Sequence, residues 1–385
     1  MAAPFELPER PRILVIVLRR IGDVLLTTPL LRTLRRGYPA ASIDVLAFSG
    51  TEGILQGNPD VDAVVSVPQR PSMRETVTLI ARLLRKYDLV VSTQAGDRPA
   101  FLALAASGAR VGIVPAAGDG AWWKRRVFQR AVPAVQNQHR IEEVLRLAVC
   151  LGLTPQREVV CPSDAARGGT RRDGPYAVIH ATPMFRYRRW TNEGWRGLVR
   201  ALKERGLSVL ATGGPDPSER AYLDGLLRLG DASVERLDGR LTWPELAALL
   251  GGASVYVGPD TSMTHLAAAA GCPTVALFGP TDPRLWGPWP SGGLDRAWDA
   301  AGSIQRRGNV WLVQNALPCT PCQREGCERH LDSASACLDG LSLDRVLSAV
   351  DKALEVREAS GAPMGWREAS KASMEAGMTP SPVKP

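Results

Sequence analysis

The chain alternates short runs of apolar, β-branched residues with longer stretches of helical periodicity, and this alternation constrains its fold more than any other feature. Strands are expected at 12–18, 43–47, 89–92, 111–114, 176–180, 208–211, 254–257 and 274–278. Strands that alternate with helices form parallel sheets covered by helices on both faces. The sequence therefore predicts an α/β protein with two doubly wound, Rossmann-like domains that face each other across a central cleft.

Helical periodicity fills the spaces between these runs. Helices are expected at 22–36, 76–86, 140–151, 192–205, 218–229, 244–250, 262–270 and 342–357. Pro29 lies inside the first of them, and proline is unfavourable in a helix interior. Either a regular helix begins there with Thr28 as its cap, or the first turn is kinked.

The length of 385 residues is too great for one ordinary hydrophobic core. Residues 161–175 are rich in Gly, Pro, Ser and charge, which is typical of an interdomain linker. We expect a first domain at 1–165 and a second at 166–358. The tail at 359–385 lacks apolar periodicity and is expected to be disordered.

The net charge of +8 is compatible with a phosphorylated substrate, an anionic membrane surface or simply a solvated basic surface. No RNP, zinc-finger or helix-turn-helix signature is present, so no nucleic-acid partner is expected. No apolar run approaches the twenty residues of a spanning helix, and the first twelve residues resemble no secretory signal. We expect a cytoplasmic protein. The sequence leaves open whether its basic surface docks peripherally on the inner membrane.

Gly22 and Asp23 come directly after the first strand. Ligands of open α/β sheets bind outside the carboxyl ends of the strands, so Asp23 is expected at the lip of the cleft. An Asp in this place can cap the next helix, or it can act as a base.

A second group follows a strand of the second half: Asp260, Thr261, Ser262, Met263 and His265. Hydroxyls and an acid make a turn there, and an alanine-rich helix begins. The free N–H groups at such a helix start form an anion site suited to a pyrophosphate, although the same residues are also ordinary helix caps.

Two more loops follow strands of the second half. Thr182 and Arg188 lie in a loop with three arginines, which suits a diphosphate, although it is also typical of a solvated basic loop. Gly213 and Gly214 permit the close backbone approach that a nucleotide needs. No P-loop, GxGxxG or HExxH motif is present, which disfavours the ordinary ATPase, NAD and zinc-protease interpretations.

These motifs resemble, in order and position, those of glycosyltransferase family 9, the ADP-heptose:lipopolysaccharide heptosyltransferases. The resemblance rests on residues 19–24 (RRIGDV), 257–265 and 278–282. It implies a GT-B fold and an inverting, metal-independent transfer with no cofactor. The family's catalytic Asp falls on Asp23. Its phosphate-binding Lys falls on Arg188, and the Gly of its Asp-Thr-Gly helix start falls on Ser262.

The resemblance also implies the partners, a nucleotide-sugar donor such as ADP-heptose and an anionic glycolipid acceptor. The donor would contact Thr182, Gly213, Gly214 and Met263 beside Arg188 and residues 260–265. Arg19, Arg20 and Arg140 are candidates for holding the acceptor. Another nucleotide-sugar, and a non-catalytic nucleotide-sugar-binding protein, remain alternatives.

Four of the seven cysteines cluster, and they are Cys319, Cys322, Cys327 and Cys337. A CxxC with two further cysteines can hold a structural zinc ion, although this spacing fits no standard zinc finger. A redox or disulfide role and plain reduced thiols remain alternatives.

Overall fold

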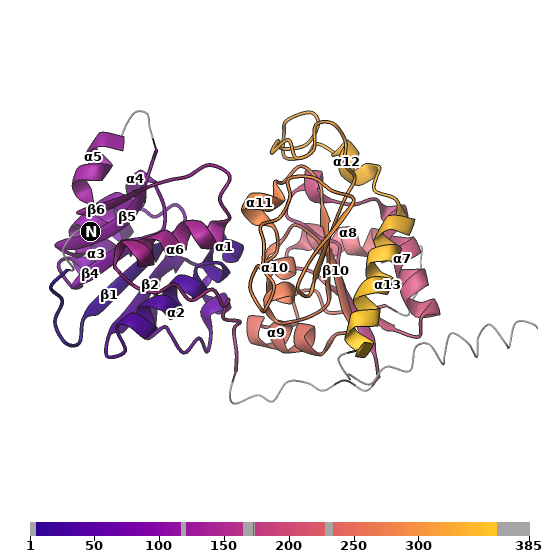
Figure 1. The fold of residues 1–385 in the computed structure, drawn as a ribbon, viewed down its shortest axis with the longest axis horizontal. Coiled ribbons are helices and arrows are strands. Elements are labelled where there is room, and N and C mark those ends of the chain that lie inside the picture. The colour runs from indigo at the N-terminus through magenta and orange to yellow at the C-terminus, as the bar shows by residue number, and fades with distance from the viewer. Residues whose placement is uncertain (1–4, 117–120, 165–171, 173, 228–233, 360–385) are drawn as a thin grey trace, which may run out of the picture.

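The computed structural model describes residues 5–116, 121–164, 172, 174–227 and 234–359. Two sheets organise the chain, one in each half, and Figure 1 shows the two halves side by side. The predicted α/β architecture with two doubly wound sheets is therefore present. No helix in the described ranges is long and apolar enough to cross a membrane.

The first sheet has the strand order β3-β2-β1-β4-β5-β6, and every neighbouring pair is parallel. This is the order of a Rossmann sheet, in which the chain leaves the centre in opposite directions. Its strands are β1 (Arg12–Val17), β2 (Ser42–Phe48), β3 (Ala63–Val67), β4 (Leu89–Ser92), β5 (Ala109–Val114) and β6 (Arg130–Pro133). The helices of this half are α1 (Ile21–Leu25), α2 (Thr28–Gly37), η1 (Glu52–Leu55), α3 (Met73–Leu83), α4 (Asp97–Ala106), α5 (Ala121–Val127) and α6 (Arg140–Cys150).

Alternate residues of β1 enter two different cores, which shows how the helices cover this sheet. Ile13, Val15 and Val17 pack with residues of α2 and α6. Leu14 and Ile16 pack on the other face with residues of α3, α4 and α5. A strand buried on both faces reads as a continuous apolar run, and for this reason β1 was recognisable in the sequence.

The second sheet repeats this plan with one added edge strand. Its order is β12-β13-β11-β10-β7-β8-β9, and only β12 is antiparallel to its neighbour. Its strands are β7 (Tyr176–His180), β8 (Ser208–Thr212), β9 (Glu235–Arg236), β10 (Val255–Pro259), β11 (Thr274–Phe278), β12 (Ile304–Arg307) and β13 (Val310–Gln314). Its helices are η2 (Arg186–Arg188), α7 (Asn192–Glu204), α8 (Pro217–Leu227), α9 (Trp243–Gly252), α10 (Ser262–Ala269), α11 (Pro283–Trp286), α12 (Ala336–Asp339) and α13 (Leu343–Ala359).

The expected helix at 22–36 is two helices. α1 ends at Leu25, and α2 begins at Thr28 with Pro29 in its first turn, where the missing N–H of proline costs no hydrogen bond. Of the two alternatives, the structure has a regular helix that begins near Pro29, although its N-cap is Thr27 and not Thr28. Part of the expected linker at 161–175 lies outside the described residues. The same holds for almost all of the expected tail at 359–385.

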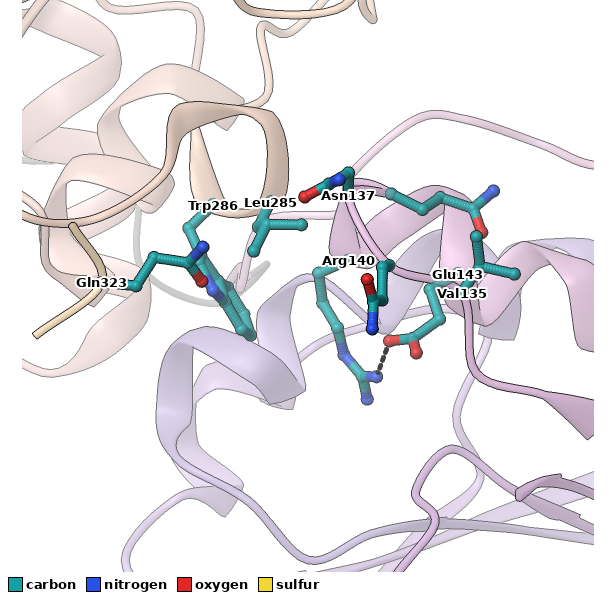
Figure 2. Close-up of a pocket in the computed structure, with 9 residues that line it drawn as sticks. Val135, Asn137, Arg140, Glu143, Leu285, Trp286 and Gln323 are labelled. Atoms are coloured by element: carbon teal, nitrogen blue, oxygen red, sulfur yellow. Dashed lines mark hydrogen bonds and ion pairs between the residues drawn. The ribbon is translucent and has the colours of Figure 1, made fainter. Parts of the chain in front are cut away.

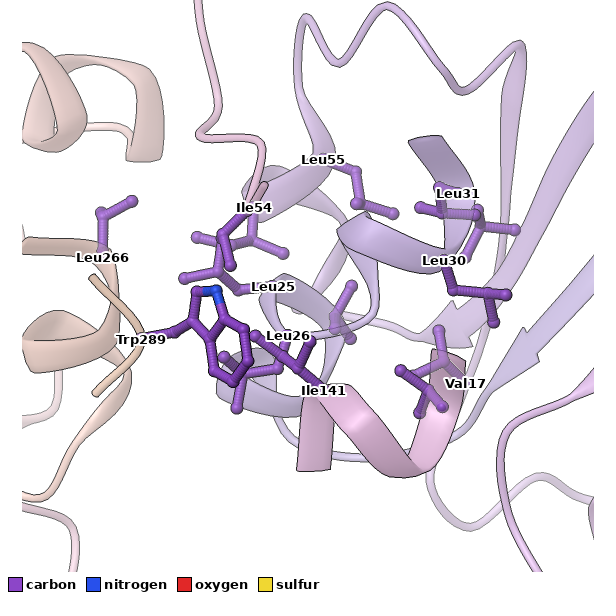
Figure 3. Close-up of a cluster of buried hydrophobic side chains, with 14 of the residues drawn as sticks. Val17, Leu25, Leu26, Leu30, Leu31, Ile54, Leu55, Ile141, Leu266 and Trp289 are labelled. Carbon is purple, nitrogen blue, oxygen red and sulfur yellow. The ribbon is translucent and has the colours of Figure 1, made fainter. Parts of the chain in front are cut away.

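An apolar core continues from one half into the other. Leu266 of α10 and Trp289 belong to the same buried cluster as Leu25, Leu26 and Ile141 of the first half, and Figure 3 shows Trp289 beside these first-half side chains. The Trp289 indole N–H also donates to the Arg157 carbonyl at 2.9 Å. Helix α1 thereby lies beside α10.

Candidate active site

The start of α1 lies against the start of α10, at the junction of the two halves (Figure 1). A Cβ atom added to Gly22 would lie 3.7 Å from Ser262 Cα and 3.8 Å from His265 Cδ2. The two helices are therefore in van der Waals contact at this glycine. Asp23 and the N-terminus of α10 consequently share one interface, as the strand-end argument predicted.

Asp23 is the third residue of α1 and is 8% exposed. It is not the N-cap, because Arg20 occupies that position. Its Oδ1 lies 3.6 Å from Arg19 Nη1 and 3.6 Å from Arg140 Nε, yet it accepts no hydrogen bond from any described residue. Two guanidinium groups thus lie next to a buried carboxylate oxygen that has no hydrogen-bond partner among the described residues.

Arg140 reaches this carboxylate from the first residue of α6. Its guanidinium donates to the Thr93 carbonyl at 2.9 Å and to Glu143 Oε2 at 2.7 Å. Thr93 directly follows β4, so Arg140 is fixed to the carboxyl end of the first sheet. Of the three candidate acceptor arginines, Arg19 and Arg140 converge on Asp23. Arg20 instead stacks on the Phe185 ring of the second half, with 4.5 Å between its Cζ and the ring centroid.

On the other side of the interface, Asp260 joins three loops of the second half. Its Oδ2 accepts a hydrogen bond from Thr281 Oγ1 at 2.7 Å and pairs with Arg188 Nη1 at 3.0 Å. The same nitrogen of Arg188 donates to the Asp260 carbonyl at 3.0 Å. This ion pair holds the Arg188 guanidinium beside the first turn of α10.

No side chain among the described residues caps α10, although Thr261 occupies the N-cap position. His265, one turn into the helix, is buried, and desolvation lowers its pKa although the Asp260 and Asp23 carboxylates act in the opposite direction. A lowered pKa keeps the imidazole neutral near pH 7. The start of α10 thus offers free backbone N–H groups next to a neutral ring and a cation.

The remaining donor candidates differ in whether they have a polar group without a hydrogen-bond partner. Thr182 is buried next to Gly213, where an added Cβ would lie 3.3 Å from Thr182 Oγ1, and this hydroxyl has no hydrogen-bond partner among the described residues. The Gly214 N–H already donates to Glu219 Oε2 at 2.7 Å. The Met263 side chain packs in the apolar core.

A cavity of about 350 Å³ adjoins Arg140 at the junction of the halves. Figure 2 shows Arg140 and Glu143 of the first half with Trp286 and Gln323 of the second. The cavity is also lined by the side-chain amides of Gln136, Asn137, Gln138 and Gln323. Amides can both donate and accept hydrogen bonds, which suits the hydroxyls of a sugar. The sequence offered no signal for this cavity, because most of its lining lies in irregular loops.

Three of the four clustered cysteines, Cys322, Cys327 and Cys337, lie near one another. Burial, together with the neighbouring Cys322 and Cys327, raises the pKa of the Cys337 thiol to about 11. Cys319 is exposed and, like the other three, is a free thiol. Within the described ranges, no three His, Cys, Asp or Glu side chains are grouped so that they could hold a metal ion. A zinc site at this cluster stays a prediction from the sequence, and zinc analysis of the purified protein and of Cys319→Ser would test it.

Acid is expected to destabilise the protein through two buried histidines. His139 contacts the Gly287 carbonyl through Nε2 at 2.8 Å, and burial lowers its pKa to about 4. The pKa of His180 is likewise lowered to about 4 by burial. Since both bind protons more weakly in the folded state, stability present above pH 6.5 is lost as the pH falls towards 4. At pH 5 each histidine costs the folded state about 2 kcal/mol.

Urea denaturation at pH 7.5 and pH 5 measures this loss. His139→Asn is expected to lose less stability than the wild type between these pH values. The matched control is His330→Asn, since His330 is exposed. This variant should lose as much stability between pH 7.5 and pH 5 as the wild type does. Equal pH dependence of His139→Asn and wild type would rule out the contribution of His139.

Comparison with known proteins supports the same family that the motifs resemble. The chain matches the model of glycosyltransferase family 9 (heptosyltransferase) over residues 76–293. It is 32% identical over 287 residues to lipopolysaccharide heptosyltransferase 3 of Escherichia coli, covering 70% of this chain and 83% of that protein. It is 29% identical over 341 residues to lipopolysaccharide heptosyltransferase 1 of Pseudomonas aeruginosa, covering 82% of this chain and 87% of that protein.

Solved structures with the same fold include two from this family. A family 9 glycosyltransferase from Veillonella parvula superposes with a TM-score of 0.70 at 17% identity, covering 90% of this chain and 97% of that chain. An E. coli heptosyltransferase with ADP superposes with a TM-score of 0.66 at 22% identity, covering 89% and 99%. Both likenesses concern the fold.

Proposed function

Because this chain belongs to glycosyltransferase family 9, the heptosyltransferase family, we propose that it transfers a heptose from ADP-heptose to an anionic glycolipid of the lipopolysaccharide type. Its two facing Rossmann-like halves form the GT-B fold that the resemblance implied. One observation carries the proposal: helix α1, which holds Asp23, is in van der Waals contact through Gly22 with the uncapped start of α10 in the other half. The names of the relatives support the choice of sugar and acceptor.

The donor diphosphate would lie on the first turn of α10. Backbone N–H groups at a helix start and the positive end of its dipole favour an anion. Arg188 stands beside this turn and can donate to phosphate oxygens with the guanidinium atoms that Asp260 does not use. These groups stabilise the charge that develops on the leaving diphosphate, which is the task of a metal ion in other transferases.

The acceptor would approach from the side of the first half. Asp23 takes the proton from its hydroxyl as the oxygen attacks the anomeric carbon. The new carbon–oxygen bond forms on the face opposite the bond to the diphosphate, which breaks, so the anomeric configuration inverts. Arg19 and Arg140, which already contact Asp23, are suited to hold an anionic group of the acceptor.

A transfer assay with ADP-heptose and lipopolysaccharide-core acceptors tests this function. We expect product with inverted anomeric configuration, read by the one-bond carbon–proton coupling at the new anomeric carbon, and unchanged turnover in excess EDTA. Turnover with a different nucleotide-sugar alone would reject the heptose donor. Donor binding without transfer to any acceptor would favour a non-catalytic nucleotide-sugar-binding protein.

A further inference from the structure

Helix α3 presents an apolar stripe to solvent. Met73, Val77 and Ile80 follow one another at intervals of four and three residues, which places them along one side of the helix, and Leu84 directly follows the last turn as its C-cap. All four are exposed, with Met73 at 83%. An apolar stripe at helical spacing normally faces a core, so this one lacks its partner within the described chain.

The neighbouring helices extend this surface. Helix α4, which contacts α3, exposes Phe101 and Leu104, and α5, which contacts α4, exposes Trp122. These three helices and the residue after α3 carry seven of the eleven large apolar side chains exposed in the described part of the chain. We call this surface the α3–α5 face. α5 lies on the outer side of the first half in Figure 1, away from the second half.

The same segment is strongly basic. Between residues 69 and 127 the sequence has ten Lys and Arg against four Asp and Glu, so this stretch accounts for six of the eight net positive charges. Arg74 and Arg82 of α3, and Arg85 two residues after it, alternate with these apolar residues along the sequence. On α5, the Arg126 guanidinium lies over the Trp122 ring at 5.5 Å. Cations therefore border the apolar side chains on both helices.

We infer that the α3–α5 face binds the surface of an anionic phospholipid bilayer. Apolar side chains of an interfacial helix enter the headgroup region, while neighbouring Lys and Arg bind acidic lipids. Trp is favoured at this depth, as Trp122 would be. A second copy of the chain is disfavoured, since pairing these faces would bring their exposed arginines, Arg74, Arg82, Arg125 and Arg126, against one another. Nucleic acid would use the cations and leave the apolar stripe unexplained.

The position of this face fits the proposed function, and this part of the argument rests on that function. Helix α4 begins four residues after Thr93, whose carbonyl holds Arg140 beside Asp23. The half that would supply the base for the acceptor would thus be the half that contacts the lipid surface.

Flotation of the full-length protein with vesicles tests the inference, without any nucleotide-sugar present. We expect binding to phosphatidylcholine mixed with phosphatidylglycerol, no binding to phosphatidylcholine alone, and weaker binding as salt rises. Arg125→Glu/Arg126→Glu should weaken binding by about 25-fold or more, since each basic residue near the surface contributes about fivefold. Val77→Ser/Ile80→Ser should also weaken it. Both pairs are exposed, so folding should be preserved, and circular dichroism would check this.

Matched controls are Val149→Ser, exposed on α6, and Arg200→Glu, exposed on α7, which should bind like wild type. The inference would be overturned if the protein bound neither kind of vesicle, or bound vesicles with and without phosphatidylglycerol equally. Wild-type binding by both double variants would also overturn it. A dimer in gel filtration that Val77→Ser/Ile80→Ser converts to a monomer would assign the face to a second copy. Because binding is measured without transfer, its failure leaves the proposed reaction to its own assay.

Discussion

Replacing Asp23 with Asn is expected to lower kcat by about three orders of magnitude, while the affinity for ADP changes by about twofold or less. The amide keeps the shape of the carboxylate but cannot take a proton from the acceptor hydroxyl. The proposed task of Asp23 is to receive that proton, and its Oδ1 accepts no hydrogen bond from the described residues. Steady-state kinetics with saturating donor and acceptor, and calorimetric titration with ADP, measure the two quantities separately.

Two further variants separate loss of the base from other effects. Asp62→Asn removes a carboxylate that pairs with Arg35 at 2.5 Å on the surface, and it should leave turnover unchanged. Arg19→Gln removes one cation beside Asp23 and should raise KM for the acceptor more than it lowers kcat. An Asp23→Asn enzyme that kept more than a tenth of wild-type kcat would be incompatible with Asp23 as the base.

Arg188→Met is expected to lower kcat/KM for the nucleotide-sugar by about 100-fold to 1,000-fold and to weaken ADP binding. The change removes the cation beside α10. It also leaves the buried Asp260 carboxylate with Thr281 as its remaining side-chain hydrogen-bond partner among the described residues. An unbalanced negative charge at this place repels a diphosphate.

Arg188→Lys should recover most of this loss, to about tenfold below wild type or better, because it restores the charge but not the planar donor geometry. Arg189→Met is the matched control, since the neighbouring Arg189 stacks on Tyr222 at 4.2 Å. Its donor kinetics should stay close to wild type. If Arg188→Met bound ADP as tightly as wild type, the donor diphosphate would have to lie elsewhere.

Much of the fold could be predicted because its central strands are buried on both faces. β1, β7, β10 and β11 appear in the sequence as unbroken apolar runs. Shorter or edge strands were missed. β6 is four residues long and ends in a proline, so its pattern resembles a loop. β13, with the sequence VWLVQ, did carry a readable apolar signal that the prediction overlooked.

The site could be predicted as a set of strand ends but not as a set of contacts. Asp23 and Ser262 follow central strands, and parallel topology brings such ends to one edge. The pairing of Arg140 with Asp23 joins residues more than one hundred positions apart, and it depends on how α6 packs on the sheet. Sequence patterns report which side of a helix is apolar, and they carry no information on where a long guanidinium side chain ends.

The apolar core that runs from α1 into α10 also has a thermodynamic consequence. Separating the halves would expose Leu266 and Trp289 to water, so neither half has a complete interior of its own. Heating should therefore produce a single cooperative transition, not two. A nucleotide that touches only the second half would then protect both from unfolding, because the two halves share one equilibrium.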